Sequence, residues 1–311
     1  MPNVSVIIPT LNRCALLPRA IESARRAVSD VEIIVVDDAS EDQTREVCQD
    51  MSGIVYIRTR RRLGTGGARN VGVIASSSEY ISFLDDDDVR LSGSIDAQVE
   101  SLEARPDAGM IYGRVLYGDQ ECRPKGGSYP EQCPQGDLFW RLMSWNFIPC
   151  PTVVFRRACL LRLGLLEESA PGIDDWDLWI RIAELYPVLA TEQAVAIWRQ
   201  PTPMSGQFSF RAVGMHRQAR RLHRDKWLRL PRAVDVGPAR RNEAARAFSD
   251  RALQQLVWDA TAKLKARRLP DFARIALAAA RMYPVGISRT ILSSSTWLSL
   301  ISGVGSWRRG Q

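Results

Sequence analysis

The sequence predicts an α/β fold, with a mostly parallel, Rossmann-like central sheet flanked by helices and a helical C-terminal extension. Residues 4–9, 31–36 and 54–57 are apolar, largely β-branched runs, and each is followed by a helical or glycine-rich stretch. Strands that are apolar throughout are typical of parallel sheets covered by helices on both faces. Ligands of such sheets bind beyond the carboxyl ends of the strands, so functional side chains are expected there.

The same alternation continues through the first two thirds of the chain. Ser40 and Gln43 have the spacing of a capping box, which predicts a helix from Ser40 to about Met51. The stretch 118–136 is rich in Gly, Pro and charge, and we expect a long surface loop there. Further helices are expected over 17–28, from the Gly64–Asn70 stretch through Ile74, and over 96–104 and 176–183; further strands are expected over 79–84, 108–112, 115–117, 147–155 and 188–198.

Charge divides the chain into two parts. From Arg211 onward there are 21 Lys and Arg residues against 6 Asp and Glu, whereas the preceding residues hold 21 against 29. An acidic body with a basic tail predicts two functional regions, a domain over 1–210 and a basic helical region over 211–311. The chain has 311 residues, of which 45% are hydrophobic, and this is enough to build a substantial core.

The N-terminus shows no secretory signal, because no basic stretch is followed by an apolar core. Six cysteines are scattered without metal-ligand spacing, which is typical of reduced thiols in a cytoplasmic protein without structural zinc. Only two histidines are present, so histidine-based chemistry is not expected.

The end of the chain is apolar and basic, but it does not suit a membrane span. Residues 287–307 include Arg289 and many serines and glycines, which argues against a transmembrane helix. One interpretation is an interfacial helix on the cytoplasmic face of an anionic membrane; the other is a helical subdomain packed on the N-terminal body. The interfacial helix would use Leu292, Trp297, Leu298, Leu300 and Ile301 with Arg289, Arg308 and Arg309.

Four consecutive carboxylates, Asp85 to Asp88, follow the apolar run over 79–84. Clustered carboxylates repel one another, so their proximity is costly unless a proton or a cation lies among them. Hard oxygen ligands favour Mg²⁺ or Mn²⁺, which share their remaining positions with water and substrate phosphates. The alternative is an acidic surface turn that caps a helix beginning near Ser92.

Five motifs stand in the order found in one enzyme family and together cover residues 3 to about 205. They are Val4–Thr10 with Asn12 and Arg13, Val35–Ser40, Ala68–Gly72, Phe83–Asp88 and Asp174–Trp179. With these motifs the chain resembles an inverting nucleotide-sugar glycosyltransferase of family 2, which has the GT-A fold. Each motif alone is weakly specific, whereas five in sequence are specific.

The resemblance implies that the first motifs bind the nucleotide-sugar donor. Pro9, Thr10 and Asn12 would lie near the nucleotide, and Asp38 would accept a hydrogen bond from the imide N–H of the base. Arg69 would hold the base or the diphosphate. From the residues alone, Asp38 could instead form an Asx-turn, and Arg69 could be a solvated surface charge.

For the run of aspartates, the resemblance implies a divalent metal site. Asp87 would be the direct ligand of Mg²⁺ or Mn²⁺, with Asp85 or Asp86 nearer the ribose or the waters of the metal. Asp85 thus counts as both a metal and a donor residue, and Asp86 as a donor residue. The cation would act as a Lewis acid on the departing diphosphate. Asp88 would be a helix-capping neighbour.

On the acceptor side, the resemblance implies that Asp175 is the general base that deprotonates the attacking hydroxyl. Asp174 lies beside it, and Trp176 would offer a face to the acceptor sugar, whereas Trp179 is expected in the core. The alternative for Asp175 is an N-cap or first-turn aspartate stabilised by the helix dipole.

Two departures from the family pattern bear on the mechanism. Arg62, within a basic run over 58–62, stands where the family often has asparagine. The family often has a histidine after the last strand, but here Arg199 and Gln200 precede a proline, so Arg199 is a candidate for the phosphate contact. The Gln/Arg-x-x-Arg-Trp signature of processive synthases is absent, which favours transfer of one sugar per encounter.

The predicted function is transfer of a sugar to a hydroxyl of a surface glycan or a lipid-linked saccharide. A non-catalytic nucleotide-sugar or glycan-binding relative is the alternative. A dinucleotide-dependent dehydrogenase is excluded, because the glycines at 64–67 follow the third strand rather than the first. Nucleic-acid binding is not expected, since no groove-reading module accompanies the basic tail.

Overall fold

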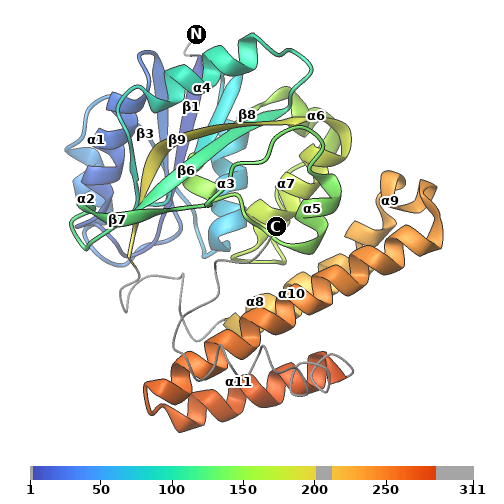
Figure 1. Cartoon of the computed structure of the whole chain (residues 1–311). Coiled ribbons are helices and arrows are strands. Elements are labelled where there is room, and N and C mark those ends of the chain that lie inside the picture. The colour runs from blue at the N-terminus through green and yellow to red at the C-terminus, as the bar shows by residue number, and fades with distance from the viewer. Residues whose placement is uncertain (1–2, 201–211, 285–311) are drawn as a thin grey trace. The chain divides into compact units, whose positions relative to one another are not determined.

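The computed structural model describes residues 3–200 and 212–284, and the chain divides into two compact units (Figure 1). The first comprises Met1–Leu142 with Asn146–Arg211, and the second Met143–Trp145 with Ala212–Gln311.

The first unit contains a nine-stranded sheet in the order β3-β2-β1-β4-β8-β6-β9-β5, with β7 paired to β6. Neighbouring strands run parallel in the pairs β1–β2, β2–β3, β1–β4 and β6–β9, whereas β8 is antiparallel to β4 and β6, and β5 is antiparallel to β9. The predicted mostly parallel sheet is therefore confirmed. The strands are β1 Val4–Thr10, β2 Val31–Asp37, β3 Val55–Arg58, β4 Tyr80–Phe83, β5 Val89–Arg90, β6 Met110–Gly118, β7 Pro124–Tyr129, β8 Val154–Arg156 and β9 Val188–Arg199.

Helices pack on both faces of this sheet because alternate residues of each strand point to opposite sides. Val6 and Ile8 of β1 join a core with Leu17 and Ile95, whereas Ile7 meets Gly72 on the other face. A Cβ on Gly72 would lie 2.3 Å from Ile7 Cγ2, so α3 packs directly against β1. The helices of this unit are α1 Leu17–Ala27, α2 Thr44–Gln49, α3 Gly64–Ala75, α4 Ser94–Glu103, α5 Phe139–Ser144, α6 Ala158–Leu163 and α7 Asp174–Leu185.

Three local predictions are wrong. No capping box forms, because α2 begins only at Thr44 and the Ser40 hydroxyl accepts a hydrogen bond from the Asn12 amide instead. The segment 147–155 is not a strand throughout, because Cys150–Thr152 forms a 3₁₀ turn and only Val154 and Phe155 belong to a strand, β8. The stretch 118–136 contains β7, which pairs with β6, and so is not a loop throughout.

The second unit is helical, with α10 and α11 side by side (Figure 1). Leu253 and Leu256 of α10 share a core with Ile275 and Ala279 of α11. The buried His223 stacks on Phe248 at 4.2 Å, and burial lowers the pKa of this imidazole to about 4. The helices are α8 Ala212–Asp225, α9 Pro231–Asp235, α10 Gly237–Lys265 and α11 Leu269–Met282, with a 3₁₀ turn Trp227–Arg229.

Within the described ranges, no helix combines the length and apolar character that crossing a bilayer requires. The residues of the predicted interfacial helix, from Arg289 to Arg309, lie outside the described part of the chain.

Candidate active site

The carboxyl ends of β1, β2 and β4 bring the first motifs together. Thr10 ends β1, and its hydroxyl donates to Asp86 Oδ2 at 2.7 Å, although the two residues are 76 positions apart. The Asp38 amide donates to the Thr10 carbonyl at 2.9 Å. Parallel strands end at the same edge of a sheet, so these polar residues meet where a ligand is expected.

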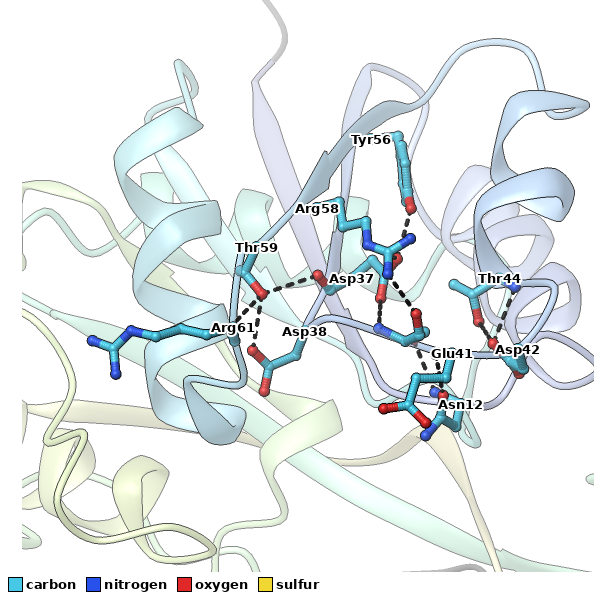
Figure 2. Close-up of polar contacts among 11 residues, drawn as sticks. Asn12, Asp37, Asp38, Glu41, Asp42, Thr44, Tyr56, Arg58, Thr59 and Arg61 are labelled. Atoms are coloured by element: carbon cyan, nitrogen blue, oxygen red, sulfur yellow. Dashed lines mark hydrogen bonds and ion pairs between the residues drawn. The ribbon is translucent and has the colours of Figure 1, made fainter.

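Asp38 is held at the start of α3 (Figure 2). Its carboxylate is almost fully buried and accepts the amide hydrogens of Leu63 at 2.7 Å and Gly64 at 2.8 Å. The Thr59 hydroxyl lies 3.2 Å from Asp38 Oδ1. Amides at a helix N-terminus are the natural partners of an anion. The Asx-turn considered for Asp38 is therefore wrong for that residue.

The turn after β2 is held instead by Asp37, which sequence reasoning overlooked. Asp37 Oδ1 accepts the Ser40 amide hydrogen at 2.7 Å, and Oδ2 accepts the Tyr56 hydroxyl at 2.6 Å (Figure 2). Asn12 completes this turn: its backbone has a φ of 56°, and its Oδ1 accepts the Glu41 amide hydrogen at 2.7 Å. The loops after β1 and β2 are thus fixed to each other beside Thr10 and the buried Pro9.

Asp85, Asp86 and Asp87 each have a different environment. Asp85 is the most accessible, with 32% of its side chain exposed, and its Oδ1 accepts from Arg69 at 2.7 Å. Asp86 is buried and is held by Thr10 and by Arg13, whose Nη1 lies 2.7 Å from Oδ1. The same Arg13 nitrogen lies 3.2 Å from Asp87 Oδ2.

Asp88 differs from its prediction, because it does not cap a helix. The chain continues into β5, and α4 begins only at Ser94. Asp88 Oδ1 accepts the Arg199 amide hydrogen at 3.0 Å, and its buried Oδ2 has no hydrogen-bond partner. The guanidinium of Arg199 donates to the carbonyl of Gln120 at 2.9 Å, and its charge favours ionised Asp87.

Negative charge is incompletely balanced in this cluster. Burial raises the pKa of Asp86 to about 6; the charge of Arg13 opposes this shift, and the charge of Asp87 adds to it. Burial also raises the pKa values of Asp87 and Asp88. Carboxylate oxygens in such a setting fit a hard divalent cation, which would supply the missing positive charge. Over residues 3–200 and 212–284, no three His, Cys, Asp or Glu side chains form a ready-made metal cluster. Protein ligands would thus need completion by phosphate and water.

The second acidic cluster lies at the start of α7. Asp174 is buried; its Oδ2 accepts from Arg69 at 2.8 Å and its Oδ1 from the Gly172 amide at 3.2 Å. Asp175 is half-buried, and its Oδ1 accepts the Trp176 amide hydrogen at 2.7 Å. Burial and then the Asp174 charge raise the pKa of Asp175 to about 7, against the opposing charge of Arg69. The residue at the N-cap position is Ile173, so the N-cap alternative for Asp175 is wrong and the first-turn position remains.

The two tryptophans of α7 are both buried. Trp179 packs against Phe83 and Phe155, as expected for a core residue. Trp176 is 7% exposed, and its indole N–H donates to the carbonyl of Leu142 at 2.7 Å. Its role towards an acceptor stays a prediction.

Arg69 joins the two clusters, and the surface-charge interpretation of this residue is wrong. Only 3% of Arg69 is exposed, and its guanidinium contacts Asp85 and Asp174, which are 16 and 105 positions away in sequence. The guanidinium carbon lies 5.3 Å from the centroid of the Phe83 ring. The structure therefore brings together Thr10, Asp85, Asp86, Asp174 and Asp175 in one site.

Sequence reasoning assigned no role to two further residues of the site. Arg13 bridges Asp86 and Asp87, and its place directly after Asn12 in the first motif was the only signal. Asn70 holds the loop before α7: its amide group exchanges hydrogen bonds with the backbone of Leu166 and donates to Glu168 at 3.0 Å.

Residues 5–161 match the family model Glycosyl transferase family 2. The chain belongs to this family. Among curated proteins, it is 36% identical over 193 residues to the Campylobacter jejuni GalNAc(5)-diNAcBac-PP-undecaprenol beta-1,3-glucosyltransferase, a match that covers 58% of this chain and 60% of the relative. An uncharacterized glycosyltransferase of Haemophilus influenzae is 26% identical over 185 residues, covering 58% of this chain and 62% of that protein. The match thus spans about three fifths of either relative.

Solved structures share the fold. S. aureus TarS in complex with UDP-GlcNAc superposes with a TM-score of 0.65 at 18% identity, covering 91% of this chain and 82% of that one. The mannosyltransferase PcManGT from Pyrobaculum calidifontis in complex with GDP-Man and Mn²⁺ gives a TM-score of 0.56 at 20% identity, covering 99% and 88%. The predicted GT-A fold is confirmed.

Proposed function

We propose that this protein is an inverting glycosyltransferase that moves a sugar from a nucleotide diphosphate-sugar to an acceptor hydroxyl. The observation that carries the proposal is the shared contact of Arg69 with Asp85 and Asp174. Because of this contact, the carboxylates that would hold a cation beside a diphosphate lie in one site with the carboxylate that would accept a proton. Membership of glycosyltransferase family 2 supports the same chemistry.

The donor would occupy the carboxyl ends of β1, β2 and β4. Asp38 Oδ1 contacts the Leu63 amide and the Thr59 hydroxyl, whereas Oδ2 accepts from the Gly64 amide. Because each carboxylate oxygen has about two acceptor sites, Oδ2 retains a further one. It can therefore accept a base N–H in the role assigned by family resemblance. The proposed donor-binding residues are Pro9, Thr10, Asn12, Asp38, Asp85 and Asp86. The family resemblance implies the same role for Arg69, but its guanidinium is engaged by Asp85 and Asp174. UDP-GlcNAc and GDP-Man in the TarS and PcManGT structures support a nucleotide-sugar donor.

Asp87 and Asp85 would hold Mg²⁺ or Mn²⁺ together with diphosphate oxygens and water. When bound, such an ion withdraws charge from the leaving diphosphate as a Lewis acid. Mn²⁺ in the PcManGT structure supports this assignment. Arg13 would hold Asp86 and Asp87 in place, because its one nitrogen reaches both carboxylates.

Asp175 would take the proton of the acceptor hydroxyl while that oxygen attacks the anomeric carbon and the bond to the diphosphate breaks. Attack from the face opposite the leaving group inverts the anomeric configuration. A pKa of about 7 suits a general base at neutral pH. Asp174 and Trp176 are the proposed acceptor residues; since Asp174 is buried against Arg69, its contribution would be to shape this side of the site.

The acceptor is proposed to be a lipid-linked saccharide or a growing surface glycan. The undecaprenol in the name of the C. jejuni relative supports a lipid-linked acceptor. Such an acceptor would place the enzyme peripherally on the cytoplasmic face of a membrane, with the basic C-terminal region as the contact and no role for nucleic acid. Exposed Trp258, Leu269 and Leu277 in that region support an interfacial contact. Flotation of the full chain with anionic but not with zwitterionic vesicles would support it; equal flotation with both would contradict it.

A donor screen tests the proposed function. Purified protein is incubated with a panel of nucleotide sugars and lipid-linked or oligosaccharide acceptors in Mg²⁺ or Mn²⁺, and products are identified by mass spectrometry. We expect transfer from one donor class, loss of transfer with EDTA, and an inverted anomeric configuration by NMR. Transfer that EDTA leaves unchanged would contradict the proposed role of the metal. A retained anomeric configuration would contradict the inverting mechanism. Donor binding without any turnover would favour the non-catalytic alternative.

A further inference from the structure

We propose that Arg69 is a positioning residue that fixes the base-bearing end of α7 against the diphosphate end of the site, rather than a direct donor ligand. This inference rests on the proposed function. It concerns how the two acidic clusters are kept at a fixed separation while substrates enter and leave.

Both terminal nitrogens of the Arg69 guanidinium are already engaged by carboxylates. Nη1 donates to Asp174 Oδ2 at 2.8 Å and Nη2 to Asp85 Oδ1 at 2.7 Å. The planar group also lies over the Phe83 ring, and only 4% of the side chain is exposed. Nε is buried and has no hydrogen-bond partner, so it does not face an accessible ligand site.

The neighbours of Arg69 on α3 serve the same segment of the chain. Asn70 is bonded to Leu166 and Glu168, just before α7. Gly66, one turn earlier on α3, approaches Asp174 so closely that an added Cβ would lie 3.2 Å from Asp174 Cβ. Gly66, Arg69 and Asn70 of α3 therefore all contact the segment 166–174, and we call this set of contacts the clamp.

The clamp matters because the proposed base directly follows Asp174. A misplacement of about 1 Å between base and anomeric carbon can cost about 100-fold in rate. Asp85 supplies the other end of the clamp, and Phe83 supplies a second connection to α7 through its contact with Trp179. A bidentate guanidinium suits this task, since a lysine ammonium does not present the same rigid fork to two carboxylates.

The test separates donor affinity from turnover in Arg69→Lys and Arg69→Gln. We expect kcat for transfer to fall about 100-fold in Arg69→Gln and at least about tenfold in Arg69→Lys. The donor Kd, measured by calorimetry with the metal present, should stay within about threefold of that of the unaltered chain. A donor Kd weakened about tenfold or more, or a kcat within about threefold of the unaltered value, would overturn the proposal.

Two further variants distinguish a misplaced base from a general loss of stability. Gly66→Ala keeps both charges and crowds Asp174 and the carbonyl of Glu167 in the same segment. We expect a kcat about three- to tenfold lower with an unchanged donor Kd, whereas an unchanged kcat would contradict the proposed positioning. Arg181→Lys alters another buried arginine of α7, which pairs with Asp177 at 2.9 Å and binds the carbonyls of Leu163 and Leu165. It should lower thermal stability and leave kcat unchanged, and an equal kcat loss in both arginine variants would assign Arg69 a merely structural role.

The outcomes also separate this inference from the proposed function. If the unaltered chain shows no turnover in the donor screen, the proposed function is wrong, and so is the inference that rests on it. If the unaltered chain turns over normally but Arg69→Gln binds the donor more weakly, the inference is wrong while the proposed function stands.

Discussion

The site contains two acidic clusters that differ in how their charge is balanced. The first cluster is the run from Asp85 to Asp87. Its carboxylates are contacted by Thr10, Arg13 and Arg69, which keep them in place to bind a cation. At the start of α7, Arg69 contacts Asp174, whereas Asp175 accepts the amide hydrogen of its neighbour Trp176. The same residue type is therefore expected to do two different things: the aspartates after β4 bind a cation, and the aspartate at the start of α7 accepts a proton.

Asp87→Asn tests the charge-binding cluster and has the largest expected effect. Losing one carboxylate of the proposed metal pair removes stabilisation of several kcal/mol, so transfer should fall about 100-fold or more. Donor affinity in the presence of Mn²⁺ should fall as well, as measured by calorimetry. The exposed Asp107, which pairs with Arg105, provides a matched control as Asp107→Asn. Unaltered Mn²⁺-dependent donor binding in Asp87→Asn would contradict the metal assignment.

The pH dependence of transfer tests the proton-transfer cluster. Because the pKa of Asp175 is raised to about 7, this carboxyl is protonated and inactive as a base at lower pH. Activity should therefore be gained as pH rises through about 7, with kcat/KM falling about tenfold per pH unit below that value. A rate that is flat from about pH 5.5 to 8 would mean that no such base limits the reaction.

Thr10→Val tests the internal support of the charge-binding cluster and has the smallest expected effect. The substitution keeps the shape but removes the hydroxyl that donates to the buried Asp86 Oδ2. We expect a loss of about 1–3 kcal/mol in unfolding free energy, measured by denaturant titration. The partly exposed Thr191, whose hydroxyl accepts the Gln193 amide hydrogen, offers the control Thr191→Val, expected within about 0.5 kcal/mol of the unaltered chain. Equal stability of the two variants would show that the Thr10 contact is dispensable.

Much of the fold could be predicted because it depends on local hydrophobic pattern. The buried runs over 4–9 and 31–36 became β1 and β2 with one residue added to each. Predictions failed where a distant partner decided the outcome. Ser40 had the right spacing for a helix cap, but the Asn12 backbone, 28 positions away, took its hydroxyl. Asp88 was likewise predicted to cap a helix, but it accepts the amide hydrogen of Arg199, 111 positions away.

The candidate site shows the same limit. Motif order located the aspartates, since their place after a strand is visible in the sequence. The burial of Arg69 between Asp85 and Asp174 was not visible, because it depends on the approach of α3 to α7 at Gly66. Arg13 belongs to the first motif, yet only the fold shows that it reaches two carboxylates.

The most direct test of this division of labour compares donor binding and transfer in Asp175→Asn. Asparagine keeps the size of the side chain and removes the base, so transfer should fall by about 10²- to 10⁴-fold. The donor Kd measured with Mn²⁺ should stay unchanged, in contrast to Asp87→Asn, which should lose both properties. Transfer by Asp175→Asn at the unaltered rate, or loss of its donor binding, would contradict the assignment of proton transfer to this end of the site.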